Sequence, residues 1–197
     1  LWRQTLSGQG NWQGSLELQL HPKGRYDYKA QWQSNLLGVG LNWPEPYRKA
    51  AKIKQPLQIR AQGNQRGSQL YLDWQNGLHA AGMLESGSTR FRRLWIDNQA
   101  EPVLDPLSSA LNVALKFDTL DLDDWTAWWQ SASLGMDDAT LDSAGSWLPS
   151  EIAMQLQAKQ LVWAKQPWDQ SSLQLNQSGQ SGKLDLLASQ VAGELSW

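Results

Sequence analysis

The sequence predicts an all-β protein made of antiparallel strands, with one short helix. Apolar and polar residues alternate over one stretch after another, as in strands that have one buried and one solvated face. Gly, Pro and Asn lie between these stretches, where they favour turns. Residues 122–132 depart from this period and show helical spacing instead. The 197 residues include 13 Trp but only 2 Phe, and the length permits a substantial core.

The first strand pair is predicted over residues 12–20 and 25–32. Both stretches alternate, and the intervening "HPKG" has the proline and glycine of a tight turn. We therefore expect a hairpin whose apolar side chains share one face. These apolar positions are Leu16, Leu18 and Leu20 in the first strand and Tyr26, Tyr28 and Trp32 in the second.

Residues 42–56 interrupt the alternation. Because proline cannot donate a hydrogen bond to a strand ladder, Pro44, Pro46 and Pro56 are expected to end one strand and start the next. The basic residues here indicate either a solvated loop that shields a sheet edge or a site for anionic head groups. We expect that all four can be neutralised together without loss of the fold. These four residues are Arg48, Lys49, Lys52 and Lys54.

Five further strands are predicted in the middle of the chain. The Asn76-Gly77 pair is the strongest hairpin signal among them, since both residues tolerate the positive φ of a tight turn. The strands are expected at residues 56–64, 68–77, 78–86, 90–97 and 111–120. Their apolar faces are predicted to contain Leu57, Ile59, Leu70, Leu72, Trp74, Val113, Leu115 and Phe117.

The helical segment at residues 122–132 begins among acidic residues. Asp121 or Asp123 is suited to cap its first turn, and the following loop adds Asp137, Asp138 and Asp142. A glycosidase needs two carboxylates, but acids at a helix start also cap the helix and complement its dipole. We interpret these residues as capping and loop residues, without a catalytic role.

The C-terminal part again alternates. Strands are expected at residues 151–158, 160–164, 171–179, 182–189 and 191–197, with apolar positions at Ile152, Met154, Leu156, Leu173, Leu175, Leu184 and Leu186. A sheet with one apolar face must bury it against a second sheet, against itself in a barrel, or against something that is not protein. Periodicity does not choose among these three.

Composition argues against several kinds of chemistry. The chain has no Cys, its His21 and His79 lack partners at ligand spacing, and no GxSxG motif is present. We expect neither an enzyme nor a metal or cofactor site. A net charge of -2 does not favour nucleic acid, and no stretch is apolar enough for a membrane-spanning helix. The first residue is not Met and the last stretch reads as a strand, so we expect a segment cut from a longer protein.

Tryptophan leaves a binding function open. Exposed Trp side chains stack on sugars in carbohydrate-binding modules, and Trp43, Trp74, Trp95 and Trp163 are candidates for such platforms. Most Trp in β-rich chains simply pack in the core or at its rim. A carbohydrate-binding sandwich and a structural spacer therefore remain alternatives.

Four stretches resemble one known family. They are "LLGVGLNWPEPYRKAAKIKQPLQIRAQGN", "FRRLWIDNQ", "LKFDTLDLDDWTAWW" and "GKLDLLASQVAGELSW". Their order and spacing resemble the YhdP-type members of the AsmA-like bacterial envelope proteins, which are related to TamB. Together they span residues 36–197.

The resemblance implies a fold and a function. It implies a long, strongly curved sheet that forms an open, taco-like groove, of which residues 1–197 would be one segment in the periplasm. The full-length protein would be anchored in the inner membrane and carry phospholipids to the outer membrane, supporting the permeability barrier. The apolar positions named above would contact acyl chains, and neighbouring segments of the same chain would complete the groove. The family supplies no catalytic residues.

Overall fold

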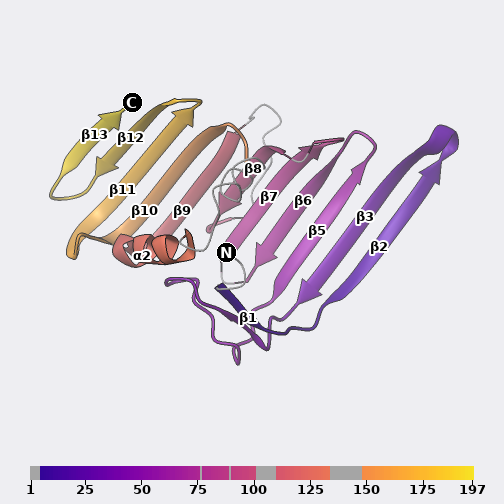
Figure 1. Ribbon diagram of the computed structural model, residues 1–197, viewed down its shortest axis with the longest axis horizontal. Helices are drawn as coiled ribbons and strands as arrows, with labels where there is room; N and C mark the ends of the chain where they lie inside the picture. Colours follow the sequence, from indigo (N-terminus) through magenta and orange to yellow (C-terminus); the bar gives the residue numbers. More distant parts are fainter. Residues whose placement is uncertain (1–4, 76, 89, 101–109, 134–147) are drawn as a thin grey trace.

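One large open sheet dominates the fold (Figure 1). The computed structural model describes residues 5–75, 77–88, 90–100, 110–133 and 148–197. Eleven strands pair in the order β13-β12-β11-β10-β9-β8-β7-β6-β5-β3-β2, and β1 and β4 form a separate two-stranded sheet. The all-β prediction is confirmed: the large sheet is curved and is not closed into a barrel.

The strands follow the predicted alternation closely. Their bounds are β1 (Leu6–Gly8), β2 (Gln13–His21), β3 (Arg25–Ser34), β4 (Val39–Leu41), β5 (Leu57–Asn64), β6 (Gly67–Trp74), β7 (Leu78–Glu85), β8 (Phe91–Asp97), β9 (Ala110–Asp121), β10 (Glu151–Trp163), β11 (Gln166–Ser178), β12 (Ser181–Leu187) and β13 (Ala192–Ser196). The α-helix α2 (Leu122–Ser133) confirms the predicted helix, and a 3-10 turn η1 (Pro22–Gly24) joins β2 to β3.

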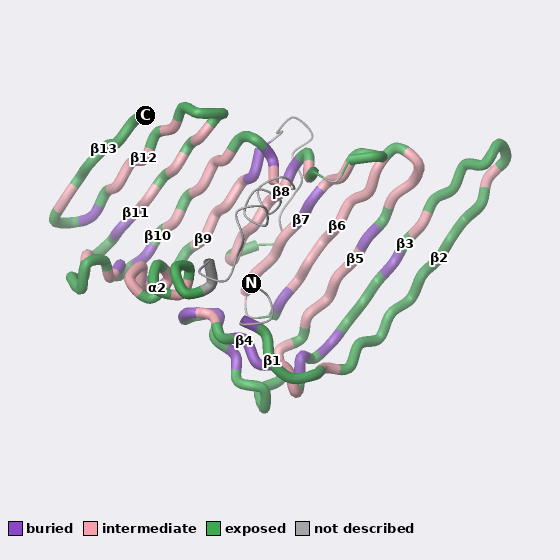
Figure 2. The backbone as a smooth tube through the Cα atoms, viewed as in Figure 1, coloured by how far each residue is buried: buried purple, intermediate pink, exposed green. Residues whose placement is uncertain are grey.

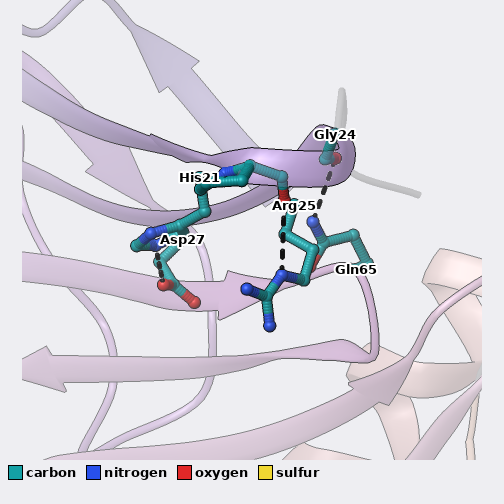
Figure 3. A network of polar contacts seen from close by, with 6 residues as sticks. His21, Gly24, Arg25, Asp27 and Gln65 are labelled. Atoms are coloured by element: carbon teal, nitrogen blue, oxygen red, sulfur yellow. Dashed lines mark hydrogen bonds and ion pairs between the residues drawn. The ribbon is translucent and has the colours of Figure 1, made fainter.

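Polar contacts hold the β2–β3 turn (Figure 3). Lys23 and Gly24 have φ of 66° and 71°, the left-handed conformation that such a tight turn requires. The His21 Nε2 atom lies 2.6 Å from the Asp27 carboxylate. The side-chain amide of Gln65 donates through Nε2 to the backbone carbonyl of Gly24 at 3.2 Å. Gln65 follows β5, so the tip of this hairpin is tied to the next one.

Two of the strand pairs are parallel. The expectation of a wholly antiparallel sheet is wrong at β9, which runs parallel to both β8 and β10. Parallel neighbours need a connection of a dozen or more residues, whereas tight turns join antiparallel ones. Residues 98–109 and 122–150, which precede and follow β9, are long enough for such crossovers. The pattern within a strand carries no information about its direction.

The alternation shifts by one residue across three adjacent strands. The ladder of β10 with β9 and the ladder of β10 with β11 both lack a pairing at Lys159. This residue lies opposite Asp118 on β9 and Gln170 on β11. Gln170 has φ of 49°, and Lys159 forms an ion pair with Asp118 at 2.7 Å. Beyond this level the apolar face continues at Leu120 and Leu161. The shift also explains why one long strand, β10, reads as two short ones in the sequence.

The buried core lies at one end of the strands (Figure 2). Residues 36–55, which we call the insert, pack there with α2 against the sheet. The insert contributes Leu36, Leu41 and Tyr47, while α2 contributes Leu122 and Trp125. As predicted, β5 begins immediately after Pro56. The core is therefore built under two connections and leaves much of the sheet uncovered.

Aromatic rings cover three strand glycines. Trp32 lies over Gly14, Phe91 over Gly82 and Trp197 over Gly182, so that a Cβ atom on any of these glycines would collide with the ring. A ring lying over a glycine replaces the packing that the glycine lacks. Two of the three rings are Trp, which gives part of the high Trp content a structural role.

Candidate functional site: the apolar face of the sheet

A row of apolar side chains crosses ten strands, from β3 to β13, and continues on β2 at Gly14. Residues that pair directly in a ladder project on the same face of a sheet. The register therefore places the whole row on one side. In sheet order from β2 the row is Gly14, Trp32, Ile59, Leu72, Ala80, Ile96, Val113, Met154, Leu175, Leu184 and Leu195.

The adjacent row lies on the opposite face and is polar except at Ala114. In the same order it is Gln13, Gln33, Gln58, Asp73, His79, Asp97, Ala114, Gln155, Gln174, Asp185 and Glu194. Successive residues along each strand thus lie on opposite faces, one apolar and the other compatible with water. This contrast, repeated across the sheet, makes the molecule two-sided.

Every residue predicted to line a groove lies on the apolar face. The register brings together Leu16, Leu18, Leu20, Tyr26, Tyr28, Trp32, Leu57, Ile59, Leu70, Leu72, Trp74, Val113, Leu115, Phe117, Ile152, Met154, Leu156, Leu173, Leu175, Leu184 and Leu186. The sequence analysis left out Leu94, Ile96, Leu111 and Leu195, which the register places on the same face. The alternation of Leu94 with Ile96 is short and Leu195 comes two residues after a Gly, whereas Leu111 begins the same alternation as Val113, Leu115 and Phe117, so the sequence signal for Leu111 was present.

The apolar face is covered at one end and uncovered at the other. Trp74 and Phe117 are 4% and 7% exposed, because the insert and α2 pack over them. By contrast Leu16, Leu18 and Leu20 on β2 are 69%, 58% and 75% exposed. Exposed apolar patches larger than those of ordinary monomers mark a surface that contacts something else.

The order of the motifs and the two-sided open sheet agree with a single family. The sequence pattern that defines the YhdP protein family matches residues 1–197. The chain belongs to the YhdP family. It is thereby an envelope protein of the AsmA-like group. No curated protein and no solved structure matches the chain.

In this YhdP-family chain, aromatic rings connect the insert to the sheet. The Tyr47 ring stacks on Trp74 at a centroid distance of 5.9 Å and meets Phe117 and Trp125 edge-on at 6.2 Å. Trp43 lies edge-on to Trp74, with an interplanar angle of 87°. Burial raises the pKa of the Tyr47 phenol, and the nearby Asn98 side chain offsets part of this effect. The cluster joins the sheet, the insert and the helix.

Three indole groups in this cluster lack hydrogen-bond partners. The Nε1 atoms of Trp43, Trp74 and Trp125 are buried and find no acceptor among the described residues. An unsatisfied buried donor costs about 1–3 kcal/mol. The packing between the insert, α2 and the sheet is thus apolar and leaves these three N–H donors without an acceptor. Trp43 and Trp74 also do not form the coplanar platform that the carbohydrate alternative requires.

Lys49 corrects one sequence-based expectation. Its side chain is 3% exposed, and its ammonium group donates to the carbonyls of Leu36, Val39 and Ala50 at 2.7, 2.6 and 3.3 Å. Burial lowers the pKa of Lys49. Lys49 is therefore neither a solvated residue that shields an edge nor one that is free to meet a head group. That all four basic residues can be neutralised together without loss of the fold stays a prediction.

The other three basic residues of this segment are exposed. Arg48 donates through Nε to the carbonyl of Trp43 at 3.4 Å, and Lys52 and Lys54 lie on the surface of the insert. These three side chains are positioned to meet an anionic group or to shield the region around the insert. A head-group site and an edge-shielding loop both stay predictions for these three residues.

The acidic residues at the helix have structural partners. Asp121 caps α2, since its Oδ1 accepts from the Asp124 amide at 3.0 Å. Asp123 accepts from the amides of Ala164 and Lys165 at 2.9 and 2.7 Å, bracing the β10–β11 turn, in which both residues have positive φ. The interpretation of Asp121 as a capping residue is confirmed. The predicted loop residues Asp137, Asp138 and Asp142 lie outside the described residues.

Both histidines face carboxylates on the ladder. His21 lies 2.6 Å from Asp27, and His79 Nδ1 lies 3.0 Å from Asp73. These partners are on neighbouring strands, which spacing along the sequence does not show. Within the described ranges no group of three or more His, Asp or Glu side chains is arranged to hold a metal ion. No described helix is long and apolar enough to cross a membrane.

The polar face also contains open hollows. One of about 940 Å³ extends over β2, β3, β5, β6, β7 and β8, and its lining includes Glu17, Lys29, Gln62, Gln69 and Arg92. Amides and charges of both signs line it together with Leu18, Met83 and Leu84, so its surface is mixed. The apolar face remains the surface whose exposure needs a partner.

Proposed function

We propose that this chain is a segment of a periplasmic conduit that carries phospholipids between the inner and outer membranes along the apolar face of its sheet. The full-length protein would be anchored in the inner membrane and would support the permeability barrier of the outer membrane. The observation that carries the proposal is the apolar row from β3 to β13, which shares its face of the sheet with the exposed leucines of β2. It offers acyl chains a continuous surface without any reactive group.

The energetics suit transport. Burying an acyl methylene stabilises a complex by about 0.8 kcal/mol, so a chain of roughly sixteen carbons gains about a dozen kcal/mol at most. Neighbouring positions along the row are chemically alike, since from β5 to β13 all of them are aliphatic: Leu, Ile, Val, Met and one Ala. A lipid can therefore shift from strand to strand without losing contact, while its head group stays in water at the rim.

The outer edges of β2 and β13 suit neighbouring segments of the same long chain. Within the described residues each of these strands pairs on one side only. An unpaired strand edge presents free N–H and C=O groups that accept a further strand. Additional strands at both edges would extend the apolar row in both directions.

The two alternatives have less support. A carbohydrate-binding sandwich needs two large sheets packed face to face and a platform of coplanar Trp. Eleven of the described strands form a single sheet, the other sheet has only β1 and β4, and Trp43 meets Trp74 edge-on. A structural spacer needs a filled core, whereas the leucines of β2 are exposed.

Site-specific photo-crosslinking in cells tests the proposal. A photoreactive residue is placed in the full-length protein at Leu18, Ile59 or Leu184, and at the adjacent residue of the opposite face, Gln19, Gln58 or Asp185, as a matched control. Phospholipid adducts are expected at the first three positions and not at the second three. Equal adduct yields on both faces, or none on either, would overturn the proposal.

A further inference from the structure

The insert is held together by its own polar groups. The Lys49 ammonium group binds three carbonyls inside residues 36–50, and the backbones of Leu41 and Lys49 exchange two hydrogen bonds of 2.8 and 3.0 Å. At the base, the Gln55 amide donates to the Asn35 carbonyl at 2.9 Å. These bonds keep the insert intact as a unit whether or not it contacts the sheet.

The insert covers surface that belongs to the apolar face. Tyr47 packs on Trp74 and Phe117, both of which share their face with the row that crosses the sheet. The contact is aromatic and leaves the indole N–H groups of Trp43, Trp74 and Trp125 unsatisfied. An aliphatic chain supplies the same kind of apolar contact, and the ester carbonyls of a lipid supply acceptors.

We propose that the insert is a displaceable cover, and that the acyl chains of a diacyl phospholipid compete with it for the surface formed by Trp74 and Phe117. This inference rests on the proposed function, because it takes lipid as the molecule that moves along the apolar face. It adds that the middle of the path is closed when empty and opens as lipid arrives. Lipid bound only to the open state shifts the population toward that state.

The geometry also identifies a hinge. The insert joins the sheet through Asn35 at one end and Pro56 at the other, and the Pro56 backbone carbonyl accepts from the Gln75 backbone amide at 2.9 Å. A third connection runs through β1, which pairs with β4 of the insert and leads along the chain into β2. Because Asn35 and Gln55 are bonded to each other, the first two connections lie side by side. Rotation about this base lifts the insert together with β1, so that the internal hydrogen bonds of the insert and the β1–β4 ladder both stay intact while residues 9–12 follow the movement.

Spin-label distances test the displacement. The chain has no Cys, so labels attach only where Cys is introduced. One pair, Lys52→Cys with Gln157→Cys, joins the exposed surface of the insert to the polar face of β10. A control pair, Gln33→Cys with Gln157→Cys, joins two strands of the sheet. Diheptanoyl phosphatidylglycerol below its micellar concentration is the probe, and glycerophosphoglycerol without acyl chains is its control.

The expected result is a longer and broader distance distribution for the first pair with the lipid, no change with the head group alone, and no change in the control pair. Lipid binding is followed in parallel by a photoreactive residue at Leu18, in the uncovered part of the face. Lipid adducts at Leu18 with an unchanged first distance would overturn the displaceable cover and leave the proposed function standing. Absence of adducts at Leu18 would overturn both.

A variant tests the competition independently. Tyr47→Ala removes the ring that contacts Trp74 and Phe117 but leaves the Lys49 network of the insert in place. The yield of lipid adducts at Leu72, relative to the yield at Leu18 in the same chain, should rise several-fold. Tyr26→Ala, an aromatic truncation on the uncovered part of the face, should not raise this ratio. An unchanged or lower ratio in Tyr47→Ala would contradict the competition.

Discussion

Lys49 shows how the surroundings of one residue decide its role. A run of basic residues with prolines is typical of a solvated loop, and Arg48, Lys52 and Lys54 fit that description. Lys49 alone turns inward and binds three carbonyls. No local pattern separates it from its neighbours, because its partners are positioned by the path of the insert. Long aliphatic stems let lysine cross apolar surroundings to reach such acceptors.

The first prediction concerns the stability that Lys49 provides. Lys49→Met keeps the volume and removes the donor, which leaves the carbonyls of Leu36, Val39 and Ala50 without the ammonium group. We expect the free energy of unfolding to fall by about 1–3 kcal/mol in urea denaturation. Lys54→Met, an exposed control in the same insert, should stay within about 0.5 kcal/mol of the wild type. Equal effects of the two substitutions would contradict this role of Lys49.

A second prediction concerns alkaline pH. Burial lowers the pKa of Lys49 below its ordinary value of 10.5. Between these two pKa values the unfolded chain holds a proton that the folded chain has lost, so raising the pH through this window stabilises the folded state. Lys49→Met lacks this contribution. The free energy of unfolding of the wild type minus that of the variant should therefore increase as the pH rises from neutral toward 10.5.

The comparison of the two proteins isolates this effect. Ion pairs raise the pKa values of Lys159 and Lys183, so their contributions decrease as the pH rises, but they do so equally in both proteins. Urea denaturation across this pH range gives the required difference. If the difference in free energy of unfolding between wild type and variant stays constant or shrinks as the pH rises, the prediction is wrong. Folding would then favour the protonated amine of Lys49.

At the scale of elements, α2 and the shift of alternation in β9–β11 belong together. Beyond Asp118, Lys159 and Gln170 the three strands turn their next apolar residues toward the core. This change allows Leu120 and Leu161 to pack beneath the helix that follows β9. The helix itself was predictable from its spacing and its acidic start. Its docking was not, because it depends on the β10–β11 turn more than forty residues away.

The third prediction concerns this docking. Asp123→Ala removes the carboxylate that accepts from the amides of Ala164 and Lys165. Hydrogen bonds to charged groups contribute about 1.5–3 kcal/mol, and we expect a loss in that range in urea denaturation. Asp124→Ala is the matched control, since Asp124 is also an acid in the first turn but is exposed. A loss in Asp123→Ala no larger than in Asp124→Ala would mean that the turn is held by other contacts.

For the whole molecule, the decisive property is an open sheet with one apolar and one polar face. The sequence contains both faces strand by strand, but the continuity of the apolar row depends on the register of ten strand pairings. A slip of one residue in any of them would move the apolar residues of that strand to the polar side. The exposed leucines of β2 mark where this face is left without protein cover.

The fourth prediction concerns conduction along this face. Leu18→Asp places a charge on the apolar path at an exposed position, where the cost to folding is small. Removing about 1.5 kcal/mol of apolar contact lowers occupancy by about tenfold. We expect lipid adducts at Leu184 to fall by this factor in the full-length protein, together with a weakened outer-membrane permeability barrier. Gln19→Asp places the same charge on the opposite face and should leave both readouts unchanged.

The sequence by itself determined most strands of the large sheet, the helix, the side on which each apolar residue lies within its strand, and the family, but not the short strands β1 and β4. These features are local: they follow from a period of two, from a period of 3.6 and from turn residues that act over a few positions. Tertiary structure decided the parallel direction of β9, the burial of Lys49, and the packing of the insert and α2 over Trp74 and Phe117. These features depend on contacts between segments far apart in the chain, and such contacts leave no periodic trace in the sequence.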